Sequence, residues 1–213
     1  MHLVLAIKDD WSHNEAMPKL DKQIKREHLL DQGVSLLMAQ VYHGTGLKKI
    51  LDTVQIPKGS FYHYFESKEV FGAEVITHYI EPFIVQLAGH INNPELDGLA
   101  ALNAYFAELI HEVGQGDFKG GCLLGNLMGE IGDTSDICRA SLKQAVKRYR
   151  DLLAVGLEKA QTEGRVRRDK TAESMADLLV NTWQGALLRM KIEQSVAPIQ
   201  ACCDDLLGDY FKA

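Results

Sequence analysis

The chain has 213 residues, of which 46% are hydrophobic and 24% are charged, and its formal net charge is −6. A chain of this length can bury a core as one medium domain or as a small domain joined to a larger one. It contains no run of about 18 consecutive apolar residues, which excludes a transmembrane helix and predicts a soluble, cytoplasmic protein. Helical periodicity recurs and strand alternation does not, so we expect an all-α fold.

Although the whole chain has a negative net charge, one region of it has an excess of basic residues. Residues 22–68 contain seven Lys or Arg and four Asp or Glu. The chain from Glu69 onward contains fourteen Lys or Arg and twenty-one Asp or Glu. DNA binding needs positive charge where the phosphates lie, because counterion release depends on the contacted charges. On charge alone, this excess is equally compatible with DNA binding and with ordinary surface variation.

The N-terminal part of the chain predicts three helices. We expect a flexible extension over residues 1–21, and apolar residues then predict a helix over about 22–40. Apolar residues at i, i+3, i+4 and i+7 predict a short helix over residues 46–54. Pro57 favours a turn before a further helix that begins at about Lys58. Two short helices across a tight turn form a helix-turn-helix.

The second of these short helices carries side chains suited to DNA. Lys58 lies at its start, where an ammonium group can reach a phosphate or a guanine edge. The 3.6-residue period places Phe61 and Phe65 on one face, which we assign to the core, and leaves Tyr62 and His63 facing DNA. The remaining candidates are Ser60 and Tyr64, and for Tyr64 the alternative is packing against the first helix.

Residues 24–75 resemble the N-terminal DNA-binding domain of the TetR family of transcriptional repressors. The resemblance rests on Gly44-Thr45-Gly46-Leu47, on Ile50, on residues 54–65 and on Ser67-Lys68-Glu69. The family usually has Ala and an Ala-Gly pair where this chain has Leu51 and Val54-Gln55, and these departures lie between the helices. The resemblance supports Lys58, Tyr62 and His63 as DNA contacts and implies that the DNA backbone is anchored by Thr45, Lys48 and Lys68.

The rest of the chain predicts six further helices. A long helix starts after Ser67, with a kink or local break expected at Pro82, and the resemblance implies that it joins the DNA-binding domain to the remainder. The others are expected at about 99–110, 122–131, 135–163, 171–195 and 198–211. We therefore divide the chain into an extension, a helix-turn-helix domain over 22–68 and an effector-binding and dimerisation domain over 69–213.

Cys122 is the candidate sensor residue. It follows two glycines at an expected helix start, with Lys119 nearby, and both a helix N-terminus and a cation favour a thiolate. Residues 121–127 resemble a motif of the NemR-like subgroup, in which a cysteine at this position is associated with sensing electrophiles and oxidants and a lysine lies where Lys191 lies here. The alternative is a small packing residue. We expect an effector pocket lined by Tyr79, Tyr105, Phe106, Cys122, Asn126 and Trp183.

The last two expected helices carry more apolar surface than the outer helices of a monomer need. Leu188, Ile199, Cys202 and Leu206 are therefore assigned to a four-helix dimer interface of the kind that the family uses, with Trp183 also buried between subunits. A two-fold dimer would present two recognition helices to a palindromic operator.

These observations favour a homodimeric, ligand-responsive repressor that binds double-stranded DNA and is released by a small molecule, possibly an electrophile. The alternatives are a ligand-independent DNA-binding or architectural protein and a helical enzyme. No catalytic constellation is evident, and we expect no cofactor and no membrane partner. Cys202-Cys203-Asp204-Asp205 does not predict a metal site, because adjacent side chains on a helix point about 100° apart. We expect the other cysteines to be structural thiols.

Overall fold

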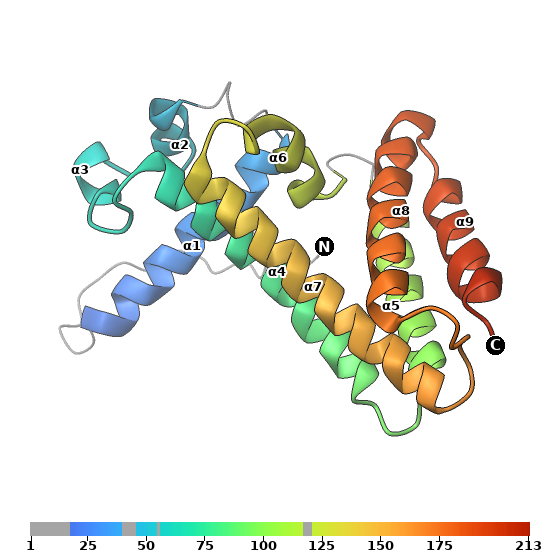
Figure 1. The fold of residues 1–213 in the computed structure, drawn as a ribbon. Coiled ribbons are helices and arrows are strands. Elements are labelled where there is room, and N and C mark those ends of the chain that lie inside the picture. The colour runs from blue at the N-terminus through green and yellow to red at the C-terminus, as the bar shows by residue number, and fades with distance from the viewer. Residues whose placement is uncertain (1–17, 40–45, 55, 117–120) are drawn as a thin grey trace.

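The structure is a computed structural model that describes residues 18–39, 46–54, 56–116 and 121–213. Over these residues the chain is helical, apart from an isolated β-bridge between Val166 and Lys212, which confirms the all-α prediction (Figure 1). The elements are α1 (Pro18–Ala39), α2 (Leu47–Val54), α3 (Lys58–Phe61), α4 (Lys68–Ile91), α5 (Gly98–Gly114), α6 (Leu123–Ile131), α7 (Asp136–Thr162), α8 (Ala172–Glu193), α9 (Ala197–Asp205) and a π-helical turn η1 (Leu206–Tyr210).

Several helices begin where a side chain caps the free backbone N–H groups. The hydroxyl of Ser67 accepts from the backbone N–H of Val70 at 3.1 Å before α4, and the hydroxyl of Ser135 accepts from that of Cys138 at 3.3 Å before α7. Such caps stabilise a helix by about 1 kcal/mol each. They explain why the expected starts of these two helices agree closely with the observed ones.

One expected boundary is wrong, and the local break offered as one alternative at Pro82 does not occur. Helix α1 begins at Pro18, so the last residues of the expected flexible extension are helical. Helix α4 continues through Pro82, where the sequence predicts a kink or local break. Proline removes one N–H donor from the helix ladder, but buried residues both before and after Pro82 hold α4 in the core, among them Ile80 and Leu87.

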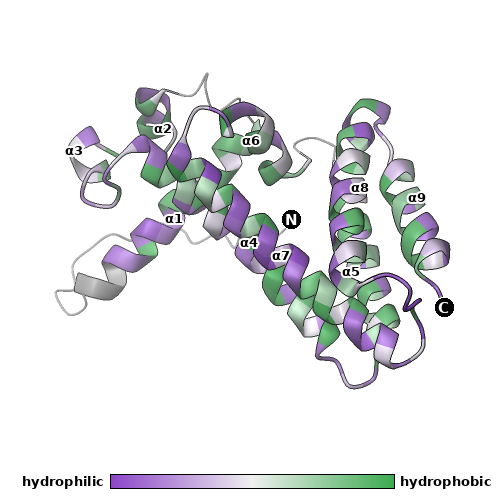
Figure 2. Ribbon diagram, viewed as in Figure 1, coloured by the Kyte–Doolittle hydropathy of each residue, from purple (hydrophilic) through white to green (hydrophobic). Residues whose placement is uncertain are grey.

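The molecule is elongated, with the short helices α2 and α3 at one end and α8 and α9 at the other (Figure 1). Helices α4 and α7 pack along each other between these ends, and α5 and α8 in turn pack on α7. Helix α6 contacts α7, α4 and α1 and is coloured as largely hydrophobic in Figure 2. It therefore connects α7 directly with the first helix of the chain.

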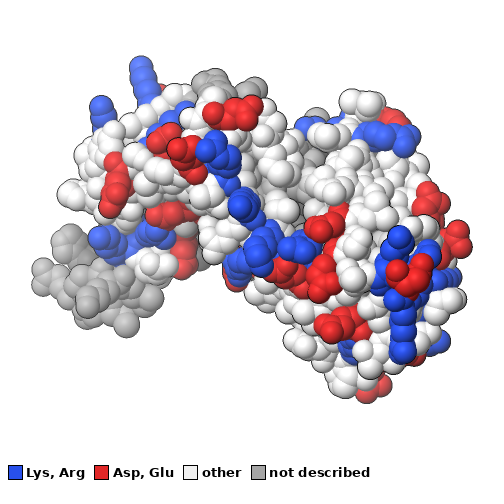
Figure 3. All heavy atoms as spheres, viewed as in Figure 1, with Lys and Arg blue, Asp and Glu red and all other residues white. Residues whose placement is uncertain are grey.

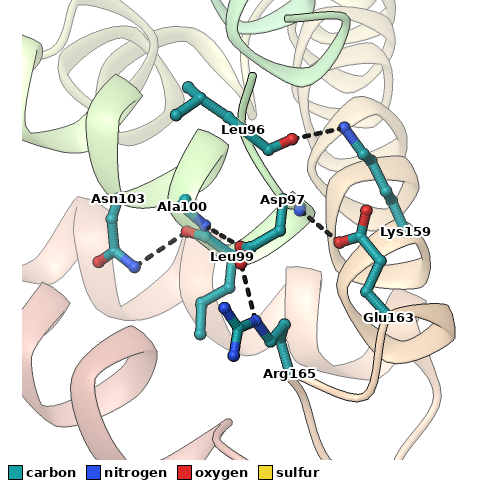
Figure 4. A network of polar contacts seen from close by, with 9 residues as sticks. Leu96, Asp97, Leu99, Ala100, Asn103, Lys159, Glu163 and Arg165 are labelled. Carbon is teal, nitrogen blue, oxygen red and sulfur yellow. Dashed lines mark hydrogen bonds and ion pairs between the residues drawn. The ribbon is translucent and has the colours of Figure 1, made fainter. Parts of the chain in front are cut away.

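A polar network fastens the turn between α4 and α5 to the end of α7 (Figure 4). Lys159 Nζ donates to the carbonyl oxygens of Ile91 at 3.1 Å and Leu96 at 3.0 Å. Glu163 Oε2 accepts from the backbone N–H of Gly98 at 2.6 Å. Asp97 caps α5 by accepting from Ala100 N at 2.8 Å and also accepts from Arg165 Nε at 2.7 Å. These contacts hold the start of α5 close to the end of α7.

Helix α1 is tied to α4 by charged and aromatic contacts. Arg26 forms an ion pair with Glu74, and its guanidinium group lies 5.3 Å from the centroid of the Phe65 ring. His78 Nε2 lies 2.7 Å from Asp31 Oδ1 in a second link between the same helices. Movement of α4 would therefore carry α1 and the helices packed on it.

Candidate nucleic-acid interface and effector site

The helix-turn-helix is present where the sequence predicts it. Pro57 has an extended backbone, with φ −61° and ψ 146°, immediately before α3. Although α3 has only four residues, helical bonding continues from Phe65 N to Phe61 O at 3.0 Å. Phe61 and Phe65 are each 1% exposed, and their ring centroids lie 5.5 and 4.9 Å from that of Phe71 on α4. The core face assigned from helical periodicity is confirmed.

The opposite face of this segment is open to solvent. Lys58 and His63 are exposed, and 48% of the Tyr62 surface is accessible. Lys48 on α2 is also exposed. Tyr64 is half-buried and packs against the hydrophobic core, which is the alternative that the sequence left open. Two further residues are predicted to contact DNA. Ser60 is half-buried, and Thr45 lies outside the described residues.

Lys68 differs from the other predicted DNA-binding lysines. It is the first residue of α4 and is half-buried. Burial lowers its pKa, and the neighbouring Cys138 partly offsets this effect. Lys68 is therefore partly shielded from water, whereas Lys48 and Lys58 are exposed.

Three predicted pocket residues form one aromatic group inside the larger domain. Tyr105, Phe106 and Trp183 are 0%, 1% and 5% exposed. The Phe106 ring centroid lies 5.2 Å from that of Tyr105 and 4.8 Å from that of Trp183, in edge-to-face geometry. Trp183 is therefore buried against Phe106 within one chain, and the prediction that it is buried between subunits is wrong.

Cys122 is the residue immediately before the first turn of α6. It is half-buried, and Gln184 Nε2 on α8 donates to its Sγ at 3.4 Å. Burial raises the pKa of Tyr79, and both the charge of Cys122 and a hydrogen bond with its thiol raise it further. The sequence gives no signal for Gln184, because only the fold brings this residue of α8 to the thiol.

The other two polar residues expected here also meet. Lys191 Nζ donates to Asn126 Oδ1 at 3.4 Å. The Lys191 side chain passes over Gly121, whose φ of +67° favours glycine and where an added Cβ would lie 2.9 Å from Lys191 Cδ. Lys119, which the sequence places near the thiol, lies outside the described residues.

The remaining thiols are shielded from solvent. Cys138, Cys202 and Cys203 are all buried, and all four cysteines are unpaired. Burial, with smaller contributions from neighbouring acidic groups, raises the pKa of Cys202 to about 11 and that of Cys203 to about 12. Because the thiolate is the reactive form, Cys122 is the cysteine best placed to react in the folded chain.

A groove of about 530 Å³ lies between α6, α7 and α8, away from the predicted pocket residues. Its apolar floor includes Leu142 and Val146, and α7 places basic side chains along its rim, namely Arg139, Lys143, Lys147 and Arg150. Figure 3 shows Lys and Arg in a band across this part of the surface. This groove could not be predicted from the sequence, since its walls come from three separate helices.

The four residues predicted at the dimer interface differ in exposure. Leu188 on α8 is 54% exposed. Ile199, Cys202 and Leu206 are 0%, 4% and 9% exposed and belong to the hydrophobic core of the same chain. These three side chains pack inward, and within the described fold they have little surface to offer to a second copy.

No described helix is both long and apolar enough to cross a membrane. The described residues also contain no group of three or more His, Cys, Asp or Glu side chains arranged to hold a metal ion.

Two family models match the chain. Residues 29–75 match the model described as bacterial regulatory proteins, tetR family, and residues 98–206 match the model described as tetracyclin repressor-like, C-terminal domain. The first spans the helix-turn-helix and the start of α4, and the second spans α5 to α9. The chain therefore belongs to the TetR family of transcriptional regulators.

Similar proteins cover nearly the whole chain. It is 34% identical over 193 residues to the HTH-type transcriptional repressor DhaR of Mycobacterium sp. (strain GP1), covering 88% of this chain and 91% of that protein. It is 30% identical over 184 residues to the HTH-type transcriptional repressor NemR of Escherichia coli (strain K12), covering 86% of this chain and 92% of that protein. The crystal structure of reduced E. coli NemR matches with a TM-score of 0.81 and 28% identity, covering 89% and 97%. The chain is accordingly a helix-turn-helix transcriptional repressor and not an enzyme.

Proposed function

We propose that the protein is a homodimeric repressor that binds a palindromic operator through α2 and α3 and is released when a small electrophile modifies Cys122. The observation that carries the DNA-binding part is the segment from Lys58 to Phe65, which presents Lys58, Tyr62 and His63 to solvent over a buried phenylalanine pair. Lysine and tyrosine side chains suit phosphate and base-edge contacts. We propose Lys48 and Lys68 as backbone anchors, with Ser60 and Tyr64 at the edge of the same surface.

The dimer is proposed to form through an outward face of α8. Leu178, Leu188 and Ile192 are 40%, 54% and 81% exposed, and their spacing places them along one side of the helix. Gly185 lies between them, with no atom within 4 Å of a Cβ built there. Apolar side chains beside a bare backbone allow a second helix to approach closely. A two-fold axis there would set two recognition segments roughly 34–36 Å apart.

The effector site is proposed around Cys122. Its thiol is the partly accessible one among four, it accepts a hydrogen bond from Gln184, and the chain is similar to NemR along most of its length. Modification of Cys122 would disturb α6, which contacts both α1 and α4. Since Arg26 and His78 tie α1 to α4, a shift of these helices would change the separation of the two recognition segments.

The DNA-binding part is tested by titrating operator DNA with the parent and with Lys58→Ala and Tyr62→Ala. Each variant should bind more weakly, by the equivalent of about 1–3 kcal/mol for a base contact, and loss of a phosphate contact at Lys58 should reduce the salt slope by about one. The control is Lys170→Ala, which removes an exposed lysine from the other domain. Binding equal to the parent in both test variants would refute the assigned surface.

A further inference from the structure

Gly59 is a glycine for which the described fold gives no reason. It is the second residue of α3 and is exposed, and no described atom lies within 4 Å of a Cβ built on it. Its φ also lies outside the left-handed region that favours glycine. Because glycine weakens a helix relative to alanine, an alanine at this position would stabilise the free chain. The glycine therefore points to a contact outside the chain.

Other glycines have a reason within the fold. A Cβ on Gly98 would lie 2.5 Å from a backbone nitrogen of α7, and Gly164 has a φ of +72°. Gly89 on α4 is more like Gly59, since it is exposed and a Cβ there meets no described atom within 4 Å. The two differ in their place in the molecule, because α3 lies at the end opposite to α8 and α9 (Figure 1). Gly89 is therefore the matched control for Gly59.

Gly59 shares a face with the exposed side chains of its segment. Residues three and four positions apart lie on the same side of a helix, so Gly59 lies one turn before Tyr62 and His63. Helical geometry extends this far, since Tyr62 has φ −68° and ψ −9° and His63 N donates to Ser60 O at 3.1 Å. Lys58, Tyr62 and His63 thus surround a stretch of bare backbone.

A side chain at this point would limit how closely DNA can approach. The long side chains of Lys58 and Tyr62 can rotate aside, whereas a Cβ is fixed to the backbone and keeps its position. Hydrogen bonds to base edges need heavy-atom distances of about 2.7–3.2 Å. A methyl group that holds the helix away from the floor of the major groove would lengthen such bonds around it, even though it removes no donor and no charge.

We propose that Gly59 is a specificity-determining residue whose bare backbone lets a base edge of the operator approach the segment from Lys58 to Phe65 at van der Waals distance. This inference rests on the proposed DNA-binding surface and adds the position at which that surface comes closest to the bases. Contact with a base edge, and not with a phosphate, confines the effect of a larger side chain to operator DNA.

The experiment compares the full-length parent with Gly59→Ala and Gly59→Leu on two DNA duplexes. The operator probe is a duplex selected from a random pool by the parent, and the second probe has the same composition in scrambled order. Gly59→Ala should bind the operator about tenfold more weakly, as expected when a methyl group is forced into a close contact, and Gly59→Leu more weakly still. Both should bind the scrambled duplex within about twofold of the parent, with an unchanged salt slope, because no phosphate contact is lost.

Thermal unfolding of the same samples separates a DNA contact from a structural role. The melting temperature of Gly59→Ala should equal or exceed that of the parent, since the added Cβ meets no described atom and alanine favours a helix. Gly89→Ala should also melt at or above the parent, and it should bind both duplexes as the parent does. A Gly59→Ala variant that melts below the parent would overturn the inference, because the glycine would then serve the fold.

The binding results distinguish this inference from the proposed function. If Lys58→Ala and Tyr62→Ala weaken operator binding and Gly59→Ala does not, Gly59 has no role in specificity while the assigned surface stands. Equal weakening of both duplexes by Gly59→Ala would replace a base edge by a phosphate and overturn the inference. If the parent selects no sequence from the pool, the proposed function fails, and this inference fails with it.

Discussion

Replacing Gly98 by alanine would place a methyl group where α5 meets the backbone of α7. A Cβ at this position would lie 2.5 Å from the Ala160 nitrogen, 2.6 Å from the Gly156 oxygen and 2.9 Å from the Ala160 Cα. All three atoms are backbone, so no side-chain rotation relieves the overlap and the helices must separate. Overpacking of this kind destabilises a protein by about 1–3 kcal/mol. For a chain of this size, that corresponds to a fall in melting temperature of roughly 2–12 °C.

The matched control is Gly89→Ala in α4. Gly89 is exposed and has no atom within 4 Å of its added Cβ, so the substitution adds helix propensity worth up to about 1 kcal/mol without a clash. Thermal unfolding followed by circular dichroism should therefore rank Gly89→Ala at or above the parent and Gly98→Ala below it. A Gly98→Ala variant that melts with or above the parent would refute the close approach of α5 and α7.

Three further predictions concern the acid range, the thiols and the dimer. The backbone N–H of Ala100 and the guanidinium group of Arg165 lower the pKa of Asp97, so its contribution to stability is present above the unfolded pKa of about 3.9 and is lost as pH falls through the lower folded value. Thermal melts from pH 7 to pH 2 should show Asp97→Ala less stable by about 1 kcal/mol near neutrality and the difference shrinking in acid. A thiol-specific chromogenic reagent should label Cys122 alone in the native protein and all four thiols after unfolding; several native thiols would contradict the burial pattern. Leu188→Glu should convert a dimer to monomers in light scattering, because an unpaired charge in a buried interface costs several kcal/mol, whereas Ile137→Glu, at a residue 45% exposed on α7, should not; a monomeric parent at micromolar concentration would contradict the dimer.

Most of the fold could be predicted because its helices carry local signals. Ser67 and Ser135 are N-cap residues that precede apolar periodic segments, and both helices begin after them. The helix does not break at Pro82, because the packing of α4, which the sequence does not show, outweighs the local cost of proline. The corner at Gly98 could not be predicted either, since the need for glycine arises from the α7 backbone 58 to 62 positions later in the chain.

The candidate sites were predictable to different degrees. The DNA-facing surface depends on the local segment 58–65, where the buried Phe61 fixes the direction of Tyr62 and His63. Around Cys122, by contrast, the hydrogen bonds come from Tyr79 on α4 and Gln184 on α8. The sequence identified Tyr79 but not Gln184, because the pattern along a long helix does not show which neighbour a polar side chain contacts.

The α8 and α9 helices show most clearly what periodicity leaves undecided. An apolar stripe indicates that one face of a helix is buried. It does not indicate whether that face packs against the same chain or against a second copy. Ile199 and Cys202 on α9 face the core of their own domain, at 0% and 4% exposure, whereas Leu188 and Ile192 on α8 remain 54% and 81% exposed. Helix α8 has a second, inward face that includes Trp183, so its outward apolar residues exceed what one chain can cover. A dimer interface is therefore best sought on α8, where a substitution tests association without first disturbing the core.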